Sequence, residues 1–166
     1  MSDNWEALSP ESVSEWINFE QGKPEWKYLA EAKPSMASRQ AEGVAYLWNR
    51  LIRHRVALLA DEVGMGKTFQ ALGVAARLWR SEPAAKVLVM APNRDICRHW
   101  KLELAAFVRY HYRVSDGLVR QGDEPVPQVT ECYGLEALAT AIESQAQLEN
   151  RGRLYVTSIH ALSGLV

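Results

Sequence analysis

Two glycines, a lysine and a threonine stand close together at Gly64, Gly66, Lys67 and Thr68, and together they have the chemistry to hold a phosphate anion. Glycine lets the backbone turn tightly and bring its N–H groups near phosphate oxygens. A lysine ammonium neutralises phosphate charge, and a threonine hydroxyl is an oxygen ligand that suits Mg²⁺. The four residues therefore predict a loop that binds a nucleoside triphosphate, with Lys67 reaching the β- and γ-phosphates and Thr68 holding the metal.

The sequence on either side of this loop predicts the two elements that it connects. Residues 55–60 form an apolar run of strand length, typical of a central strand in a parallel sheet. Residues 69–79 place apolar side chains near one face at helical spacing. Such a helix would point its positive N-terminal end at the anion. The alternative is a glycine-rich turn between a strand and a helix, with a lysine at the surface.

Apolar spacing and turn residues predict the remaining elements. Helices are expected from Ser9-Pro10 onward, from Ser38 to about Leu51, over 94–108 and over 135–148. Strands are expected over 86–91, 110–114, 128–133 and 154–157, and a loop over 117–127. Strand 55–60, the following helix and strand 86–91 predict a right-handed βαβ unit, and hence a parallel sheet.

Length and composition restrict the class of protein. The chain has 166 residues, of which 48% are apolar, so it fits one globular domain. Its net charge of −1 gives no overall attraction to nucleic acid, so such binding needs a local basic face. Cys97 and Cys132 form no zinc or disulfide framework. Since we find no membrane span and no signal peptide, a cytoplasmic location is expected by default.

Residues 1–35 are expected to be a separate helical leader. Trp and Tyr side chains lie in this polar segment at Trp5, Trp16, Trp26 and Tyr28. Large aromatic residues are usually buried, so they can cover the main domain. The other interpretation is that they recruit a partner protein.

With these elements placed, several stretches resemble one family. Residues 59–70 are similar to the first motif of Swi/Snf-type double-stranded DNA translocases of helicase superfamily two, including the acidic pair Asp61-Glu62 before the glycines. The general phosphate-loop pattern has glycine where Asp61 stands, and the resemblance accounts for that difference. It covers residues 36–166 and implies a partial RecA-like ATP-binding domain, the first helicase lobe. The implied fold is α/β: a RecA-like three-layer sandwich with a parallel sheet, incomplete and preceded by the leader.

The resemblance also implies roles for individual residues. Gln40 lies in a segment similar to the family's adenine-reading motif, where its amide would bond the base edge. With Lys67 as catalytic residue and Thr68 as ligand of Mg²⁺, the implied ATP-binding residues are Arg39, Gln40, Asp61, Glu62, Val63, Gly64, Met65, Gly66, Lys67, Thr68 and Phe69. Two later stretches resemble motifs that contact a nucleic-acid backbone, which implies contacts from Pro92, Asn93, Lys101, Thr157 and Ser158.

Further contacts with nucleic acid could come from basic residues between positions 94 and 113. The alternative is that these charges form a solvated helix face. The candidates are Arg94, Arg98, His99, Lys101, Arg109, His111 and Arg113.

An ATPase of this type also needs an acidic pair after a later strand, to hold Mg²⁺ and position water. Asp61-Glu62 lies inside the phosphate loop, and Asp123-Glu124 has no apolar strand before it. The chain therefore resembles the N-terminal part of a larger enzyme, ending before that motif, and alone should bind nucleotide weakly and hydrolyse it negligibly. We expect the intact protein to be an ATP-dependent DNA translocase. The alternatives are a nucleotide-binding regulatory or partner-recruiting module without motor activity, and a strand-separating helicase of the same superfamily.

Overall fold

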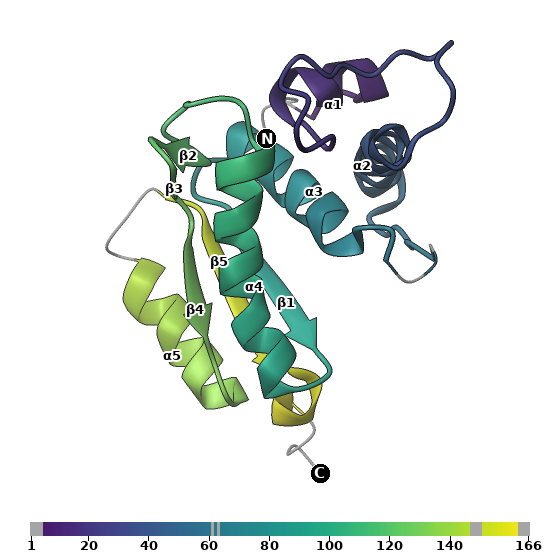
Figure 1. The fold of residues 1–166 in the computed structure, drawn as a ribbon. Coiled ribbons are helices and arrows are strands. Elements are labelled where there is room, and N and C mark those ends of the chain that lie inside the picture. The colour runs from purple at the N-terminus through teal and green to yellow at the C-terminus, as the bar shows by residue number, and fades with distance from the viewer. Residues whose placement is uncertain (1–4, 61, 63, 147–150, 163–166) are drawn as a thin grey trace.

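The computed structural model describes residues 5–60, 62, 64–146 and 151–162 and has a mixed α/β fold, as predicted (Figure 1). Its helices are α1 (Pro10–Trp16), α2 (Met36–His54), α3 (Lys67–Ser81), α4 (Arg94–Ala106) and α5 (Leu135–Ala146), with a π-helical turn η1 (Phe107–His111) and a 3₁₀ turn η2 (Ile159–Leu162). Its strands are β1 (Lys86–Ala91), β2 (Arg120–Gln121), β3 (Glu124–Pro125), β4 (Gln128–Glu131) and β5 (Arg153–Ser158).

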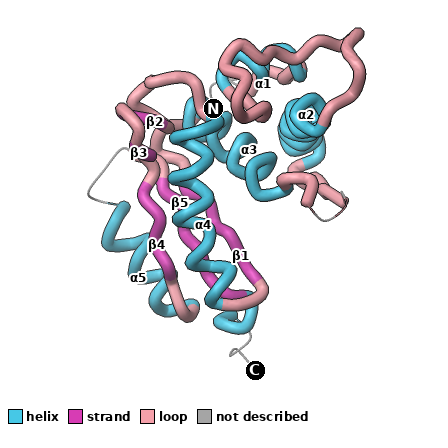
Figure 2. Tube along the Cα trace, in the orientation of Figure 1, coloured by secondary structure: helices cyan, strands magenta, loops and turns pink. Residues whose placement is uncertain are grey.

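Three of these strands form a parallel sheet in the order β1-β5-β4 (Figure 2). Because side chains alternate along a strand, the central strand β5 faces two layers. Leu154 and Val156 enter the main hydrophobic core with Leu104 of α4, whereas Tyr155 packs with Leu138 of α5 in a smaller cluster. Helices α4 and α5 therefore cover opposite faces of the sheet, which gives three layers, and β4, α5 and β5 form a βαβ unit.

The leader shares the main core. Residues Val13, Trp16 and Ile17 are at most 5% exposed and lie in the same cluster as residues of α2, α3 and α4. The Asn18 N–H donates to the carbonyl of His111 at 2.7 Å, which ties the leader to η1. The division into domains 1–35 and 36–166 stays a prediction, but the leader is packed as part of the fold.

The predicted strand over residues 55–60 is wrong. Arg55 ends α2 in the left-handed conformation, with φ 62°, and the segment after it joins no strand; Val56 is 67% exposed and Leu58 79%. A strand is held in a sheet by backbone hydrogen bonds to a neighbouring strand. An apolar composition alone does not provide that neighbouring strand. In the described part of the chain β1 pairs only with β5, so the predicted βαβ unit around the phosphate loop does not form.

The strand predicted over residues 110–114 is also wrong, because the chain continues from α4 into the π-helical turn η1. The N–H of Tyr112 donates to the carbonyl of Phe107 at 2.9 Å, five residues back. The consecutive residues His111 and Tyr112 are both buried, which does not fit a strand that has one face in solvent. Within the predicted strand, Tyr112 forms an isolated antiparallel β-bridge with Ile17 of the leader.

Local signals located most other elements. Ser9 caps α1 as expected, and Ser35 caps α2 through a reciprocal pair of hydrogen bonds with Ser38, so α2 begins two residues before the predicted start. Helix α3 and strands β1, β4 and β5 lie where the sequence placed them. The loop predicted over 117–127 contains the short hairpin of β2 and β3.

Candidate functional site

The predicted phosphate loop lies between α2 and the start of α3. Gly64 and Gly66 have φ of 87° and 68°, in the left-handed region that favours glycine. Gly66 is the N-cap of α3, and Lys67 is its first residue. The loop therefore turns at the two glycines and delivers Lys67 and Thr68 to the N-terminal end of a helix, where N–H groups and the helix dipole favour an anion.

Two buried glutamines support this turn from the helices on either side. Gln40 of α2 and Gln70 of α3 each donate from Nε2 to the carbonyl of Met65, at 3.2 and 3.1 Å. A Cβ added to Gly66 would lie 1.9 Å from Nε2 of Gln40, and one added to Gly43 would lie 1.8 Å from Oε1 of Gln70. The two glycines thus let both amides reach the loop. The sequence did not reveal Gln70; its position one turn after Lys67 was the available signal.

The other predicted loop residues differ in what they contact. Nζ of Lys67 donates to the carbonyl of Glu62 at 2.9 Å, so the lysine lies along the loop. The ring of Phe69 lies 4.6 Å from that of His111, in contact with the core. The predicted residues Asp61 and Val63 lie outside the described residues.

A pocket of ≈ 630 Å³ adjoins the loop. Helix α2 and the segment before the glycines supply its wall: Arg39, Glu42, Gly43, Tyr46, Leu58, Leu59, Ala60, Glu62 and Met65. This volume is in the usual range for small-molecule sites. The Tyr28 hydroxyl donates to Oε1 of Glu42 at 2.8 Å, so a leader residue holds one side chain of the wall. The arrangement can accept a flat ring beside an anion-binding turn.

A second candidate surface lies at the carboxyl ends of β1 and β5. The strand register pairs Ala91 with Ser158, which brings Asn93 close to Ser158. Both line a cavity of ≈ 360 Å³, whose other described wall residues are Arg94, Tyr133, Gly134 and His160. Polar and cationic side chains on a cavity at this sheet edge suit a phosphodiester. The sequence did not reveal Tyr133 or His160; both follow the end of a strand.

The remaining residues predicted to contact nucleic acid are not all at this cavity. Pro92 is exposed and adjoins it in sequence, and Lys101 is exposed further along α4. Thr157 is fully buried. Asn93 also caps α4, its Oδ1 accepting from the N–H of Ile96 at 2.9 Å.

Two of the basic candidates, His111 and Arg113, bond to the leader. His111 is 5% exposed, and burial lowers the pKa of its imidazole below the ordinary value, which favours the neutral form. The guanidinium of Arg113 donates to the carbonyl of Trp26 in the leader. Both side chains hold η1 and the leader together, so neither is free to form a basic face.

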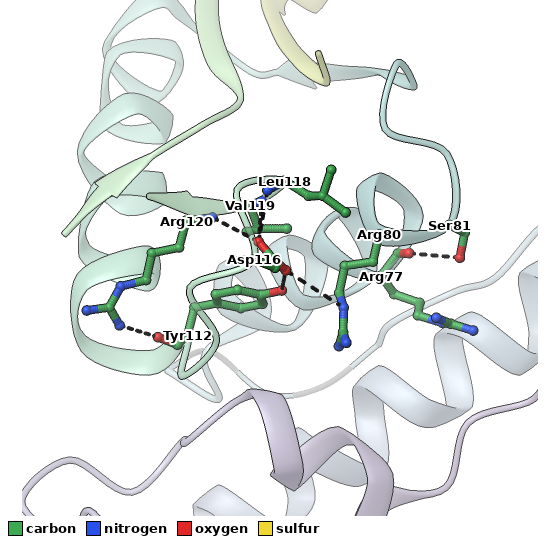
Figure 3. A network of polar contacts seen from close by, with 8 residues as sticks. All are labelled: Arg77, Arg80, Ser81, Tyr112, Asp116, Leu118, Val119 and Arg120. Carbon is green, nitrogen blue, oxygen red and sulfur yellow. Dashed lines mark hydrogen bonds and ion pairs between the residues drawn. The ribbon is translucent and has the colours of Figure 1, made fainter. Parts of the chain in front are cut away.

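A polar network at the end of α3 has a structural role (Figure 3). Asp116 accepts hydrogen bonds from the Tyr112 hydroxyl and from successive backbone N–H groups, including that of Val119 at 2.9 Å. Arg80 lies 3.8 Å away as an ion-pair partner. Burial alone would raise the pKa of the Asp116 carboxyl, but these hydrogen bonds lower it. The network fixes the loop after η1 against α3.

Among the described residues no three or more His, Cys, Asp or Glu side chains gather as a metal site. A metal at the phosphate loop would therefore depend on Thr68 and on the phosphates themselves, as Mg²⁺ commonly does. No helix in the described ranges is both long and apolar enough to cross a membrane.

Comparison with known proteins adds a family and several relatives. The profile described as the SNF2-related domain matches residues 39–161. Over 66 residues the chain is 36% identical to Protein CHROMATIN REMODELING 24 of Arabidopsis thaliana, covering 40% of this chain and 6% of that protein. It is also 38% identical over 66 residues to SNF2 domain-containing protein ENL1 of Oryza sativa subsp. japonica, which covers 40% of this chain and 7% of that protein.

A third relative is chromatin remodeling factor mit1 of Schizosaccharomyces pombe, 34% identical over 65 residues, which cover 39% of this chain and 4% of that protein. The matched segments thus span only a small part of each relative. No solved structure matches the chain significantly.

Proposed function

The chain belongs to the SNF2-related domain family, and from this membership we propose that it is the ATP-binding part of an ATP-dependent translocase that acts on double-stranded DNA. One observation carries the proposal: the turn at Gly64 and Gly66 delivers Lys67 and Thr68 to the start of α3, beside a pocket of ≈ 630 Å³. The names of the relatives, two of which refer to chromatin remodelling, support the same class.

The residues of the loop fit a triphosphate. Both glycines have the conformation that a phosphate-binding turn needs, and the amides of Gln40 and Gln70 hold the Met65 carbonyl in place. Lys67 would exchange its bond with the Glu62 carbonyl for phosphate oxygens, and Thr68 would bind Mg²⁺. Mg²⁺ would supply positive charge at the phosphates, and the γ-phosphate would carry the bond to be cleaved. The residues of this chain would bind and orient both groups.

The cavity at the carboxyl ends of β1 and β5 is the proposed contact with the DNA backbone. Asn93 and Ser158 line it together, as the resemblance implies, and Arg94 adds a cation. Lys101 lies on the same helix and is proposed to contact the duplex further along. These contacts would position the duplex without reading its sequence.

The nucleotide proposal is tested by titrating the 166-residue chain with ATP and Mg²⁺ in a calorimeter. Wild type should bind weakly, and Lys67→Ala should lower affinity by at least about tenfold, the scale of one lost charged contact. The control is Lys101→Ala, an exposed lysine outside the pocket, which should leave affinity unchanged. Binding that does not depend on Lys67, or no binding by wild type, would refute the proposal.

The leader offers less support for a partner-recruiting module. Trp16 is buried in the core, and Trp5 stacks on Trp48 with ring centroids 5.3 Å apart. Trp26 and Tyr28 pack against the same core. Internal packing thus accounts for the four aromatic side chains. The strand-separating helicase stays an alternative prediction.

A further inference from the structure

We propose that His111 of η1, held by Asn18 of the leader, is a positioning residue of the phosphate loop, because its ring packs against Phe69 and fixes the first turn of α3. The inference rests on the proposed function, since it assigns a support to the same anion-binding turn. Its basis is the contact between the rings of His111 and Phe69, whose centroids are 4.6 Å apart.

Phe69 belongs to the part of α3 that would meet the anion. It is the third residue of the helix, after Lys67 and Thr68. The N–H of Gln70 makes the first bond of the helix, to the carbonyl of Gly66 at 3.1 Å. The N–H groups of the three residues before it therefore point out of the N-terminal end, toward a bound phosphate. A contact that fixes the ring of Phe69 also fixes this turn.

The ring of His111 is enclosed by other aromatic rings. It is 5% exposed, with Phe19 of the leader 6.2 Å away and Phe107 of η1 6.4 Å away. Phe107 also lies 6.3 Å from Phe69. The four rings join the leader, η1 and α3. Because a packed interior leaves little room for shifts, they restrict where Phe69 can lie.

Two hydrogen bonds with Asn18 fix the orientation of this ring. The Asn18 N–H donates to the carbonyl of His111, and Nδ1 of His111 donates to the carbonyl of Asn18, each at 2.7 Å. A carbonyl oxygen only accepts, so Nδ1 carries the proton. Burial lowers the pKa of the imidazole, which favours the neutral ring. The leader thus holds the imidazole by both of its ends, through the backbone and through the side chain.

A histidine is unusual at this place in the sequence. Leu104, Phe107, Val108 and His111 have the spacing of one helix face, and the first three are fully buried apolar side chains. A polar group on such a face is costly unless it is hydrogen-bonded, and the bond to Asn18 offsets that cost. Histidine supplies both the bond to the leader and a flat ring for Phe69.

Two variants separate these two contacts when the 166-residue chain is titrated with ATP and Mg²⁺ in a calorimeter. His111→Asn keeps an N–H near the position of Nδ1 but removes the ring, and should lower ATP affinity about fivefold. His111→Phe keeps a ring against Phe69 but loses the bond to Asn18. It should lower the urea midpoint of unfolding, yet keep ATP affinity within about twofold of wild type.

The matched control is Val108→Ala, a fully buried residue of the same turn. It should lower stability and leave ATP affinity unchanged, which separates loss of core packing from loss of the ring contact. Circular dichroism spectra check that each variant folds. If His111→Asn does not fold, His111→Phe and Phe69→Leu decide: the first must retain ATP affinity and the second must lose it.

A double-mutant cycle tests the ring pair directly. Phe69→Leu should lower ATP affinity by about fivefold as well, and adding His111→Asn should then change it little, because the ring contact is already absent. Additive losses would overturn the inference. So would an unchanged affinity in His111→Asn, an equal loss in His111→Phe, or a loss of affinity in Val108→Ala.

These outcomes are distinct from failure of the proposed function. If ATP binding by wild type depended on Lys67 but not on the ring of His111, only the inference would fall. If wild type bound no ATP, both would fall.

Discussion

At the scale of single residues, Gly66 shows how the phosphate loop depends on the absence of a side chain. Its φ of 68° is costly for any other residue, and the space where a Cβ would be is taken by the amide of Gln40. That amide in turn holds the Met65 carbonyl. Substitution at Gly66 therefore changes both the backbone and its support.

Gly66→Ala should lower the free energy of unfolding by about 2–3 kcal/mol, of which roughly 1–2 kcal/mol is left-handed strain and about 1 kcal/mol the displaced hydrogen bond. It should also weaken ATP binding more than Gly64→Ala does. Gly64 has φ 87°, but apart from its chain neighbours no described residue comes within 4 Å of an added Cβ, so only strain is expected there. Urea unfolding and calorimetry measure both effects. Equal losses in the two variants would mean that Gln40 does not support the loop.

Asp116 gives a prediction that depends on pH. Its folded-state pKa is lowered, so its contribution to stability is fully present above the unfolded value of about 3.9 and is lost as pH falls through the folded pKa. Asp116→Asn should cost about 1–3 kcal/mol at neutral pH and progressively less in acid. The exposed pair of Asp95 with Arg98 provides the control, since Asp95→Asn should change stability by less than about 0.5 kcal/mol. Urea unfolding across pH checks this, and a loss that does not vary with pH would contradict it.

At the scale of elements, the leader is held by aromatic and backbone contacts with η1. The ring of Trp16 lies 6.2 Å from that of Tyr112, with the guanidinium of Arg80 5.4 Å from its centroid. The Arg113 N–H donates to the Trp16 carbonyl at 2.9 Å. These contacts join α1, α3 and η1 in one core.

Trp16→Ala should therefore destabilise the whole fold by about 3–5 kcal/mol, the usual cost of removing a buried aromatic ring. Trp26→Ala removes a partly buried ring and should cost less. Chemical denaturation followed by circular dichroism measures both variants. If Trp16→Ala left the stability of the main domain unchanged, the leader would be an independent unit.

How far the sequence predicted these elements depends on whether their cause is local. The caps at Ser9 and Ser35 and the apolar runs of β1 and β5 are local signals, and those elements were found. Residues 55–60 carry a strand pattern but gain no strand partner among the described residues. The turn η1 depends on the Asn18 contact, 93 residues away from His111, which no short-range pattern contains.

For the candidate site, too, the residues identified by a local signal could be predicted and those that act over a long sequence distance could not. The loop glycines, Lys67 and Thr68 lie within five consecutive residues, so their motif could be recognised directly in the sequence. The supports of the site are distant in sequence: Gln40 lies 25 residues from Met65, and Tyr28 lies 14 from Glu42. Their roles became visible only when folding brought α2 and the leader beside the loop.

At the scale of the whole molecule, the net charge of −1 means that the proposed DNA duplex would have to be attracted by a local group of cations. The cavity at the carboxyl ends of β1 and β5 has Arg94 on its wall, with the guanidinium 4.6 Å from the centroid of Tyr133. The ring holds the cation in position beside the cavity. A phosphate contact there should act alike on any duplex sequence.

Arg94→Ala should weaken binding of the chain to a DNA duplex and reduce the dependence of log affinity on log salt by about one unit. Arg53→Ala is the control, since Arg53 is exposed on α2 and does not line the cavity. Fluorescence anisotropy over a series of salt concentrations measures the slope. An unchanged slope in Arg94→Ala would exclude a phosphate contact at this cavity.

The contact between Asn18 and His111 also sets the order of events during synthesis. The two residues are separated by 93 positions, which a ribosome adding about 5–20 residues per second covers in about 5–20 s. Until η1 has emerged, Trp16 and Ile17 have no complete core to enter, and these apolar side chains are open to chaperones and proteases. The newborn chain thus completes this part of its core with a segment that left the ribosome well before η1.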